Sequence, residues 1–280
     1  MTGRDTPPGD PGRSGLPVGD LLRSGPVTND IPVPARALAI GAHPDDIEFG
    51  SGATLAKWAS AGCRVHHLIL TDGSKGSWDP GADLDRLIAD RQKECRAAAA
   101  VIDGLAGVSE SDEDRVVFLH QIDGELVNGI AQRREVARII RQVRPDVLLG
   151  HDPWRRYRLH PDHRAAGFLT LDALVAARDP HFFPELGLAP HRPDALLLWE
   201  PDLPNHIEHA HGFAAVKIEA LLRHRSQLES TMGFEPDAAS SRDSCDHSAE
   251  FAANVNRQLA SHGSLGGSEA AEAFHLMSDL

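Results

Sequence analysis

The 280-residue sequence is poor in the residues that mark several large classes of protein. It has only three cysteines, Cys63, Cys95 and Cys245, which lie far apart and form no C-x-x-C pair. This odd, scattered set predicts free thiols in a reducing compartment and argues against a disulfide framework. Aromatic residues make up 5% of the chain, so Leu, Val, Ile and Ala must fill most of the core.

Long apolar segments are also missing. No hydrophobic run reaches the length of a membrane-spanning helix, and the first 20 residues lack the apolar segment of a signal peptide. We therefore expect a cytoplasmic protein with no membrane partner. The formal net charge of −13 predicts no general affinity for DNA, RNA or anionic lipid surfaces.

The composition changes along the chain. Residues 1–30 are rich in Pro, Gly, Asp and Arg and predict a flexible leader, whereas 31–280 predict a single domain with order beginning at Arg36. Within that domain short apolar runs alternate with segments of helical spacing, which indicates repeated β-α-β units. The expected strands are 36–42, 64–70, 115–119, 146–150 and 195–199. The expected helices are 54–59, 85–101, 130–143 and 164–177, with a less regular tail in which 250–260 favours a helix.

This alternation predicts an α/β fold with a Rossmann-like, mostly parallel sheet between helices, whose ligands bind beyond the carboxyl ends of the strands. The turn after the first strand reads Gly41-Ala42-His43-Pro44-Asp45, so the glycine-rich dinucleotide fingerprint is absent. No P-loop and no Gly-x-Ser-x-Gly elbow occurs either.

The first cluster of reactive side chains, His43-Pro44-Asp45-Asp46, follows the first strand. One interpretation is helix capping, because Asp45 followed three residues later by Glu48 resembles a capping box. Capping does not require an imidazole beside two carboxylates, however. The cluster therefore also suits a catalytic or metal site.

The second cluster, residues 150–163, follows another strand and contains three His, two Asp and three Arg. Since both clusters follow strands of one predicted sheet, they can meet in space. Together they supply two His and a carboxylate, the ligand set of an open catalytic metal site. The same set occurs in non-haem iron oxygenases. The His-x-x-Asp spacing and the β-α-β surroundings favour a hydrolytic site.

The chain resembles the LmbE-like, or PIG-L, zinc-dependent deacetylases. The resemblance rests on Ala42-His43-Pro44-Asp45-Asp46 with Glu48 and Gly50, and on His160-Pro161-Asp162-His163. Weaker similarities include 71–73, Glu94, 224–227 and 271–274, so that roughly residues 36–275 are covered. The resemblance implies a Rossmann-like fold and substrates that are mostly N-acetylglucosamine derivatives.

By position, the resemblance implies that His43, Asp46 and His163 bind Zn(II), a ligand set that also accepts Fe(II) or Co(II). Asp45 would be the general base. A protonated His160 would stabilise the oxyanion or act as an acid.

Further expectations concern the substrate. Arg91 and Asp123 match positions that touch substrate hydroxyls in some family members, although a surface arginine and a turn aspartate are equally good interpretations. Asp152 either orients a ligand histidine or forms an Asp-Pro turn. The arginines at 155, 156, 158 and 164 indicate either an anionic substrate or a rim that balances local acids.

One feature departs from the family pattern. Sugar deacetylases of the family can carry a tyrosine two residues before His160, where this chain has Arg158; the only tyrosine is Tyr157. The expected activity is hydrolysis of the acyl–nitrogen bond of a small N-acetyl amino sugar, and a homo-oligomer is compatible with the sequence. The alternatives are an amidase for thiol-sugar conjugates and a non-catalytic metal-containing binding module.

Overall fold

The computed structural model describes residues 26–104, 115–233 and 242–280, without the side chains of 242–246. The strands are β1 (Thr28–Asn29), β2 (Arg36–Gly41), β3 (Arg64–Thr71), β4 (Val116–Gln121), β5 (Val147–His151), β6 (Ala195–Trp199), β7 (His206–His209) and β8 (Ala271–Met277). The helices are α2 (Asp46–Ser60), α3 (Leu84–Asp103), α4 (Ile130–Val143), α5 (Pro161–Arg178), α6 (Ala214–Leu221) and α7 (Arg242–Gly263), with short 3-10 turns η3 (Pro184–Leu186) and η4 (Arg225–Gln227).

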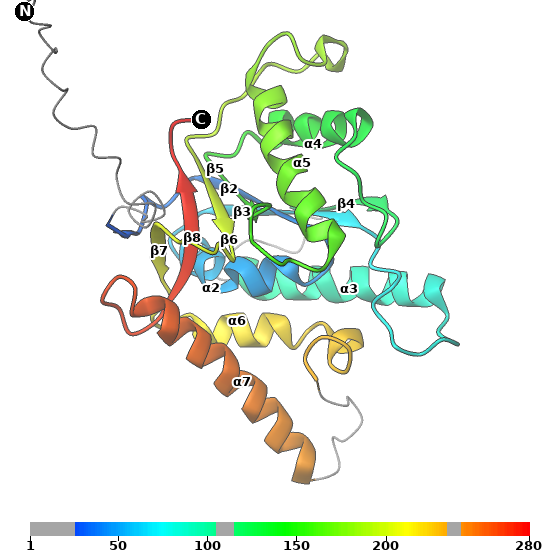
Figure 1. Ribbon diagram of the computed structural model, residues 1–280, viewed down its shortest axis with the longest axis vertical. Helices are drawn as coiled ribbons and strands as arrows, with labels where there is room; N and C mark the ends of the chain where they lie inside the picture. The colour runs from blue at the N-terminus through cyan, green and yellow to red at the C-terminus, as the bar shows by residue number, and fades with distance from the viewer. Residues whose placement is uncertain (1–25, 105–114, 234–241) are drawn as a thin grey trace, which may run out of the picture.

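The strands form one sheet in the order β1-β7-β8-β6-β5-β2-β3-β4. Strands β2 to β6 are mutually parallel, whereas β8 runs antiparallel to both β6 and β7. Helices cover both faces, with α4 and α5 on one side and α2 and α3 on the other, where α6 and then α7 follow outward (Figure 1). The fold is therefore the expected three-layer α/β architecture with additional helices on one side.

Strand β2 shows why the central strands read as unbroken apolar runs. Its alternate residues point to opposite faces, so Ala37 and Ala39 join the core beneath α2 and α3 while Leu38 and Ile40 join the core beneath α4 and α5. All four are essentially inaccessible to solvent. A sheet covered on both sides gives such a strand no solvent-facing position for a polar residue.

The sheet has a topological switch point between β2 and β5. The chain moves outward from β2 to β3 and β4, and then returns to place β5 on the other side of β2. Connections leaving β2 and β5 diverge there, which opens a crevice at the carboxyl ends of these two strands. The two clusters of reactive residues begin at the carboxyl ends of these two strands.

Several predicted boundaries were wrong, and the sequence did not predict the strand near the C-terminus. The sheet begins at Thr28–Asn29, inside the predicted leader, because β1 pairs with β7; residues 1–25 of that leader lie outside the described residues. The irregular tail contains α7, longer than the predicted 250–260, and the antiparallel strand β8.

Strand β8 connects the C-terminal part of the chain to α2, the helix that follows the first cluster of reactive residues. Both carboxylate oxygens of Glu272 accept backbone hydrogen bonds from α2, from Ala53 N at 3.1 Å and from Thr54 N at 2.8 Å. The buried Lys217 ammonium of α6 lies 2.6 Å from Glu272 Oε1. Through Glu272, β8 therefore accepts hydrogen bonds from the backbone of α2 and holds in place the helix that carries the first motif.

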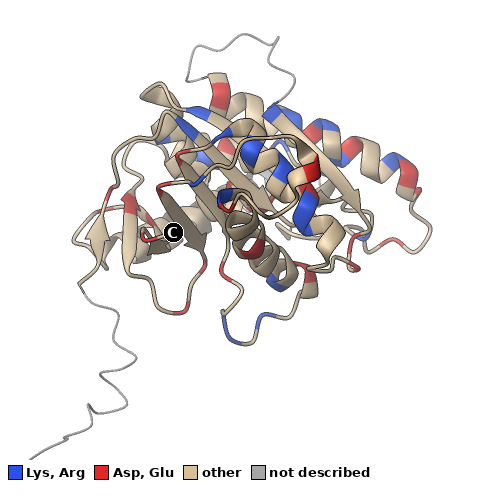
Figure 2. Ribbon diagram, turned by 90° about the horizontal axis from the view of Figure 1, so that it is seen from above, with Lys and Arg blue, Asp and Glu red and all other residues tan. Residues whose placement is uncertain are grey.

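Figure 2 shows acidic and basic residues interspersed along the outer helices, so the net negative charge is distributed rather than separated into blocks in this view. Cys63 and Cys95 are buried free thiols, as predicted, whereas the side chain of Cys245 lies outside the described part. Over the described residues, no helix combines the length and apolarity that crossing a bilayer requires.

Close packing of α2 on β6 gives a stability prediction. A Cβ on Gly50 would lie 2.4–2.8 Å from three ring atoms of the buried Trp199. We expect Gly50→Ala to lower the free energy of unfolding by about 1–3 kcal/mol, the usual cost of overpacking. Urea denaturation measures it, with Gly104→Ala as control because a Cβ there meets nothing within 4 Å. Equal midpoints for the two variants would contradict the prediction.

Candidate active site

The first motif forms the turn between β2 and α2. His43 N donates to Asp46 Oδ2 at 2.7 Å, which closes the turn and brings both side chains to one side. Asp45 is the N-cap of α2 with φ of 140°, an unusual conformation for a residue with a side chain. Its carboxylate makes no capping hydrogen bond, and Glu48 instead lies with Oε2 3.4 Å from His224 Nε2. The capping-box interpretation was therefore wrong, and Asp45 is available to the pocket.

The second motif forms the start of α5. His160 is the N-cap, and its Nδ1 accepts a hydrogen bond from Asp162 N at 3.3 Å. Pro161 occupies the first helical position, where its missing N–H costs nothing. His163 follows almost one helical turn after His160, so its ring stacks on that of His160 with centroids 5.0 Å apart.

Three residues predicted to bind a metal converge at the switch point. His43 Nδ1 lies 3.2 Å from His163 Nε2 and 3.4 Å from Asp46 Oδ2, and His163 Nε2 lies 3.2 Å from Asp46 Oδ1. Bonds of about 2.0–2.1 Å to a tetrahedral Zn(II) separate neighbouring ligand atoms by roughly 3.3 Å. Each pair of side chains thus approaches at about the spacing of neighbouring zinc ligands, with His43 and His163 facing different oxygens of Asp46.

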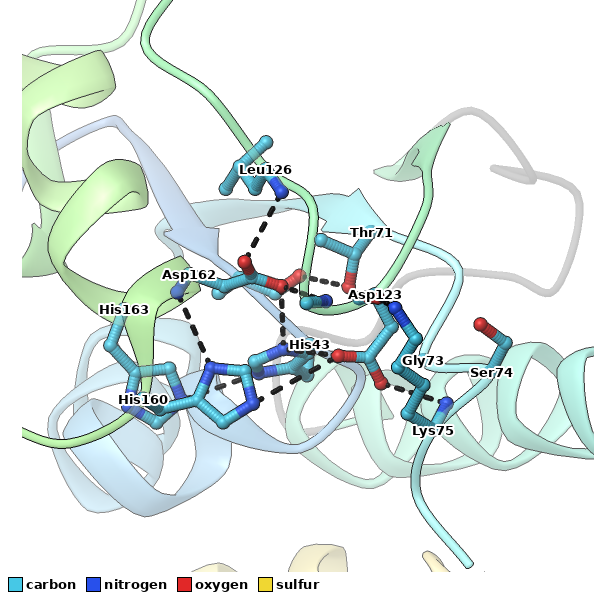
Figure 3. A network of polar contacts seen from close by, with 12 residues as sticks. His43, Thr71, Gly73, Ser74, Lys75, Asp123, Leu126, His160, Asp162 and His163 are labelled. Atoms are coloured by element: carbon cyan, nitrogen blue, oxygen red, sulfur yellow. Dashed lines mark hydrogen bonds and ion pairs between the residues drawn. The ribbon is translucent and has the colours of Figure 1, made fainter.

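Two carboxylates determine which nitrogen of His43 faces this centre. His43 Nε2 lies 3.1 Å from Asp123 Oδ1 and 3.3 Å from Asp162 Oδ2, on the side away from His163 (Figure 3). Ionised carboxylates only accept hydrogen bonds, so Nε2 carries the proton and Nδ1 keeps a lone pair in the neutral ring. Carboxylates behind a histidine are typical of metal ligands.

The backbone holds these carboxylates in turn. Asp162 accepts from Gly124 N at 2.6 Å and Leu126 N at 3.2 Å, and Asp123 Oδ2 accepts from Lys75 N at 3.0 Å. Asp123 was predicted to touch substrate, but both of its oxygens face groups of the protein. Its position indicates that it orients His43.

Charges at the centre shift several pKa values. Burial alone lowers the pKa of His43, but the carboxylates of Asp123, Asp162 and Asp46 raise it well above its ordinary value. Burial raises the pKa of Asp46, yet the His163 and His151 rings outweigh it and bring that pKa well below the usual range. Asp46 is therefore held as a carboxylate.

Asp45 lies in a different environment from Asp46. Burial, together with the neighbouring Asp46 charge, raises the pKa of Asp45 against the lowering effect of Arg91. The Arg91 guanidinium lies 3.5 Å from Asp45 Oδ1 and donates to Gly73 O at 2.8 Å and to Pro44 O at 3.2 Å. Arg91 was predicted to bind substrate; although it lines the pocket, its contacts hold the loop of Asp45.

His160 lies at the mouth of the site, with its ring edge-on to His43 at a centroid distance of 4.5 Å. Burial, together with the neighbouring His43 and His163 charges, lowers the pKa of His160. This direction disfavours the protonated His160 expected from the sequence. Because Nδ1 accepts the Asp162 N–H, the neutral ring still carries a proton on Nε2 that it can donate.

A pocket of about 340 Å³ opens over this centre. It is lined by all the predicted site residues, His43, Asp45, Asp46, Arg91, Asp123, His160 and His163, by Gln227 of the weaker similarity at 224–227, and by residues that sequence reasoning did not select, among them Lys75, His151, Trp199, Glu200 and Thr231. Of these, only His151 carried a signal, because it stands at a strand end within the second cluster.

The arginine cluster forms an ion-paired rim. The Arg155 and Arg158 guanidinium groups both pair with Glu200, and Arg156 Nε lies 2.9 Å from Asp202 Oδ2. These contacts support the interpretation that the arginines form a rim that balances local acids, rather than the interpretation that they bind an anionic substrate. Asp152 Oδ1 accepts from Trp154 N at 2.8 Å, which favours its interpretation as a turn residue.

Comparison with known proteins relates the chain to sugar deacetylases. The family model described as PIG-L, GlcNAc-PI de-N-acetylase, matches residues 38–174, which include both motifs. Diacetylchitobiose deacetylase of Thermococcus kodakarensis is 34% identical over 196 residues, which span 69% of this chain and 70% of that protein. The 1D-myo-inositol 2-acetamido-2-deoxy-alpha-D-glucopyranoside deacetylase of Geodermatophilus obscurus is 30% identical over 54% of this chain and 57% of its own length.

A solved structure is similar over most of its length. The N,N'-diacetylchitobiose deacetylase from Pyrococcus horikoshii, complexed with its inhibitor MPG, superposes with a TM-score of 0.74 and 28% identity, and the match covers 88% of this chain and 84% of that one. Fold, motifs and overall similarity agree, and the chain belongs to the PIG-L (LmbE-like) family of deacetylases.

Proposed function

We propose that this protein is a metal-dependent hydrolase that removes the acetyl group from the amide nitrogen of a small N-acetylglucosamine derivative. The observation that carries the proposal is the convergence of His43, Asp46 and His163 in a pocket, where each two of these side chains bring a pair of donor atoms within 3.2–3.4 Å. Relatives that are 34% and 30% identical to this chain carry the names of N-acetyl sugar deacetylases.

The donor set fits a divalent ion, and we propose Zn(II). Two imidazoles and one carboxylate form the three-ligand set of catalytic zinc sites, and the His43 tautomer presents a lone pair to the centre. When bound, such an ion supplies Lewis acidity, which makes water nucleophilic near neutral pH and polarises a carbonyl oxygen.

The chain's own residues would perform the proton transfers. Asp45, held by Arg91 at the pocket wall, is positioned to accept the proton of the attacking water and to return it to the leaving amine nitrogen. His160 donates from Nε2 to the oxygen that becomes negative as the carbonyl carbon turns tetrahedral. The products are acetate and a free amine.

Release of free amine tests the proposal directly. The chain is loaded with Zn(II) and incubated with diacetylchitobiose, with the N-acetylglucosaminyl inositol and with a cysteinylated glucosaminyl inositol. We expect amine release from at least one of the two acetylated sugars. Cleavage of the cysteinyl conjugate alone would favour the thiol-sugar amidase, and cleavage of none would favour a non-catalytic binding module.

A variant of His160 tests the oxyanion role. We expect His160→Ala to lower kcat by roughly 10²–10³-fold, the usual cost of one oxyanion donor, with little change in metal affinity. Steady-state kinetics and Zn(II) titration measure the two quantities. His120→Ala, at an exposed histidine of β4, is the control. A His160→Ala enzyme with wild-type kcat would remove His160 from the reaction.

A further inference from the structure

His151, the last residue of β5, lies directly behind the proposed metal ligands and is buried, with 1% exposure. Its Nε2 lies 3.1 Å from Asp46 Oδ2, and its ring stacks on that of His163 at a centroid distance of 4.5 Å. By proximity alone, Asp46, His151 and His163 could also hold an ion, since their ligand atoms lie within 4.8 Å of one another. Two roles are therefore open to His151, that of a ligand and that of a group that orients a ligand.

The other nitrogen of His151 decides between these roles. Trp199 Nε1 donates to His151 Nδ1 at 3.0 Å, and Arg158 Nη1 lies 2.9 Å from the same atom. Indole and guanidinium nitrogens are donors only, so Nδ1 must present its lone pair to both. The neutral ring then has its proton on Nε2, and a protonated Nε2 cannot bind a metal ion.

A competing contact is weaker. Ala42 N lies 3.4 Å from His151 Nε2, and as a donor it would favour the opposite tautomer. Two closer donors at Nδ1 and an acidic acceptor at Nε2 outweigh this single long contact.

The Nε2–H of His151 has a clear acceptor. Asp46 Oδ2 receives it together with the His43 N–H at 2.7 Å, so one oxygen of Asp46 is held by two donors. The other oxygen, Oδ1, faces His163 Nε2 at 3.2 Å. The two donors thus fix the rotation of the carboxylate and leave Oδ1 directed at the proposed ion.

We infer that His151 is a positioning residue that donates from Nε2 to Asp46 and so orients this proposed metal ligand, while Trp199 and Arg158 hold His151 in the required tautomer. The inference rests on the proposed function for the identity of the ligands. Arg158 also pairs with Glu200 at the pocket wall, which connects the arginine rim to the metal centre.

The tautomer is tested first, on the metal-free wild-type protein. Two-dimensional ¹H–¹⁵N correlation of the histidine ring nitrogens, with the His151 signals assigned by comparison with His151→Gln, should show Nε2 protonated and Nδ1 unprotonated. Trp199→Phe removes one donor to Nδ1 and should shift the His151 Nδ1 resonance. A wild-type His151 protonated on Nδ1 would overturn the inference, and this measurement does not depend on any variant binding metal.

Zn(II) affinity is the second test. Outer partners of metal ligands usually contribute 10–100-fold to affinity, so we expect His151→Leu to bind Zn(II) about 10–100-fold more weakly in competition titrations. His151→Gln, which retains an N–H donor, should recover part of this loss. His181→Leu, at an exposed histidine, should bind as the wild type does. Unchanged affinity in His151→Leu would overturn the role.

X-ray absorption of the Zn(II)-loaded protein separates ligand from positioning residue. We expect two imidazoles in the wild type and the same two in His151→Leu at saturating Zn(II). Three imidazoles that fall to two in the variant would make His151 a ligand and overturn the inference, with the metal site retained. A wild type that binds no Zn(II) would instead overturn the proposed site together with the role of His151.

Discussion

Replacing Asp45 by asparagine is expected to lower kcat for amide hydrolysis by about 10²–10⁴-fold, the usual contribution of a positioned acid–base group. Asparagine keeps the shape of the side chain but cannot take a proton from water. The Asp45 carboxylate is available for proton transfer because it makes no capping hydrogen bond to α2. Arg91, 3.5 Å from its Oδ1, holds it in place.

Two measurements make the Asp45 experiment specific. The Zn(II) affinity of Asp45→Asn should stay close to that of the wild type, since Asp46 and the two histidines form the proposed ligand set. Asp85→Asn, an exposed carboxylate in the first turn of α3, controls for the loss of one negative charge. Turnover by Asp45→Asn within twofold of the wild type would remove Asp45 as the general base.

Loss of a proposed metal ligand should have the largest effect on the rate of hydrolysis. We expect His163→Ala to release its Zn(II) and to lose hydrolysis by about 10³-fold or more, because Lewis-acid stabilisation contributes several kcal/mol and each 1.36 kcal/mol is tenfold in rate. His163 Nε2 lies 3.2 Å from both His43 Nδ1 and Asp46 Oδ1, so its removal opens one side of the centre.

Chelation provides the matched comparison. Wild-type protein treated with EDTA should fall to the rate of His163→Ala, and added Zn(II) should restore the wild type but not the variant. Restoration by Fe(II) or Co(II) identifies which ions the site accepts. If the chelated wild type kept its activity, the metal-dependent mechanism would be wrong.

The sequence was sufficient for the architecture of the central sheet. Strands such as β2 and β5 are covered on both faces, so nearly all of their residues are apolar. Such unbroken apolar runs are visible in the sequence. Strand β8 was missed because its side chains include Glu272, which is buried only through contacts to α2 and Lys217. Those contacts join residues more than 50 positions apart, so no local sequence pattern predicts them.

The sequence by itself determined which residues bring chemistry to the pocket: a His-Pro-Asp-Asp turn directly after one buried strand, and a His-Pro-Asp-His helix start that follows the loop after another. Only the tertiary structure decided how these groups are oriented. Asp123 turned out to lie behind His43, and His151 donates to Asp46 because Trp199 and Arg158 occupy its other nitrogen. The physical reason is that a tautomer or a carboxylate rotation depends on donors from distant strands, whereas ligand chemistry resides in the residue itself.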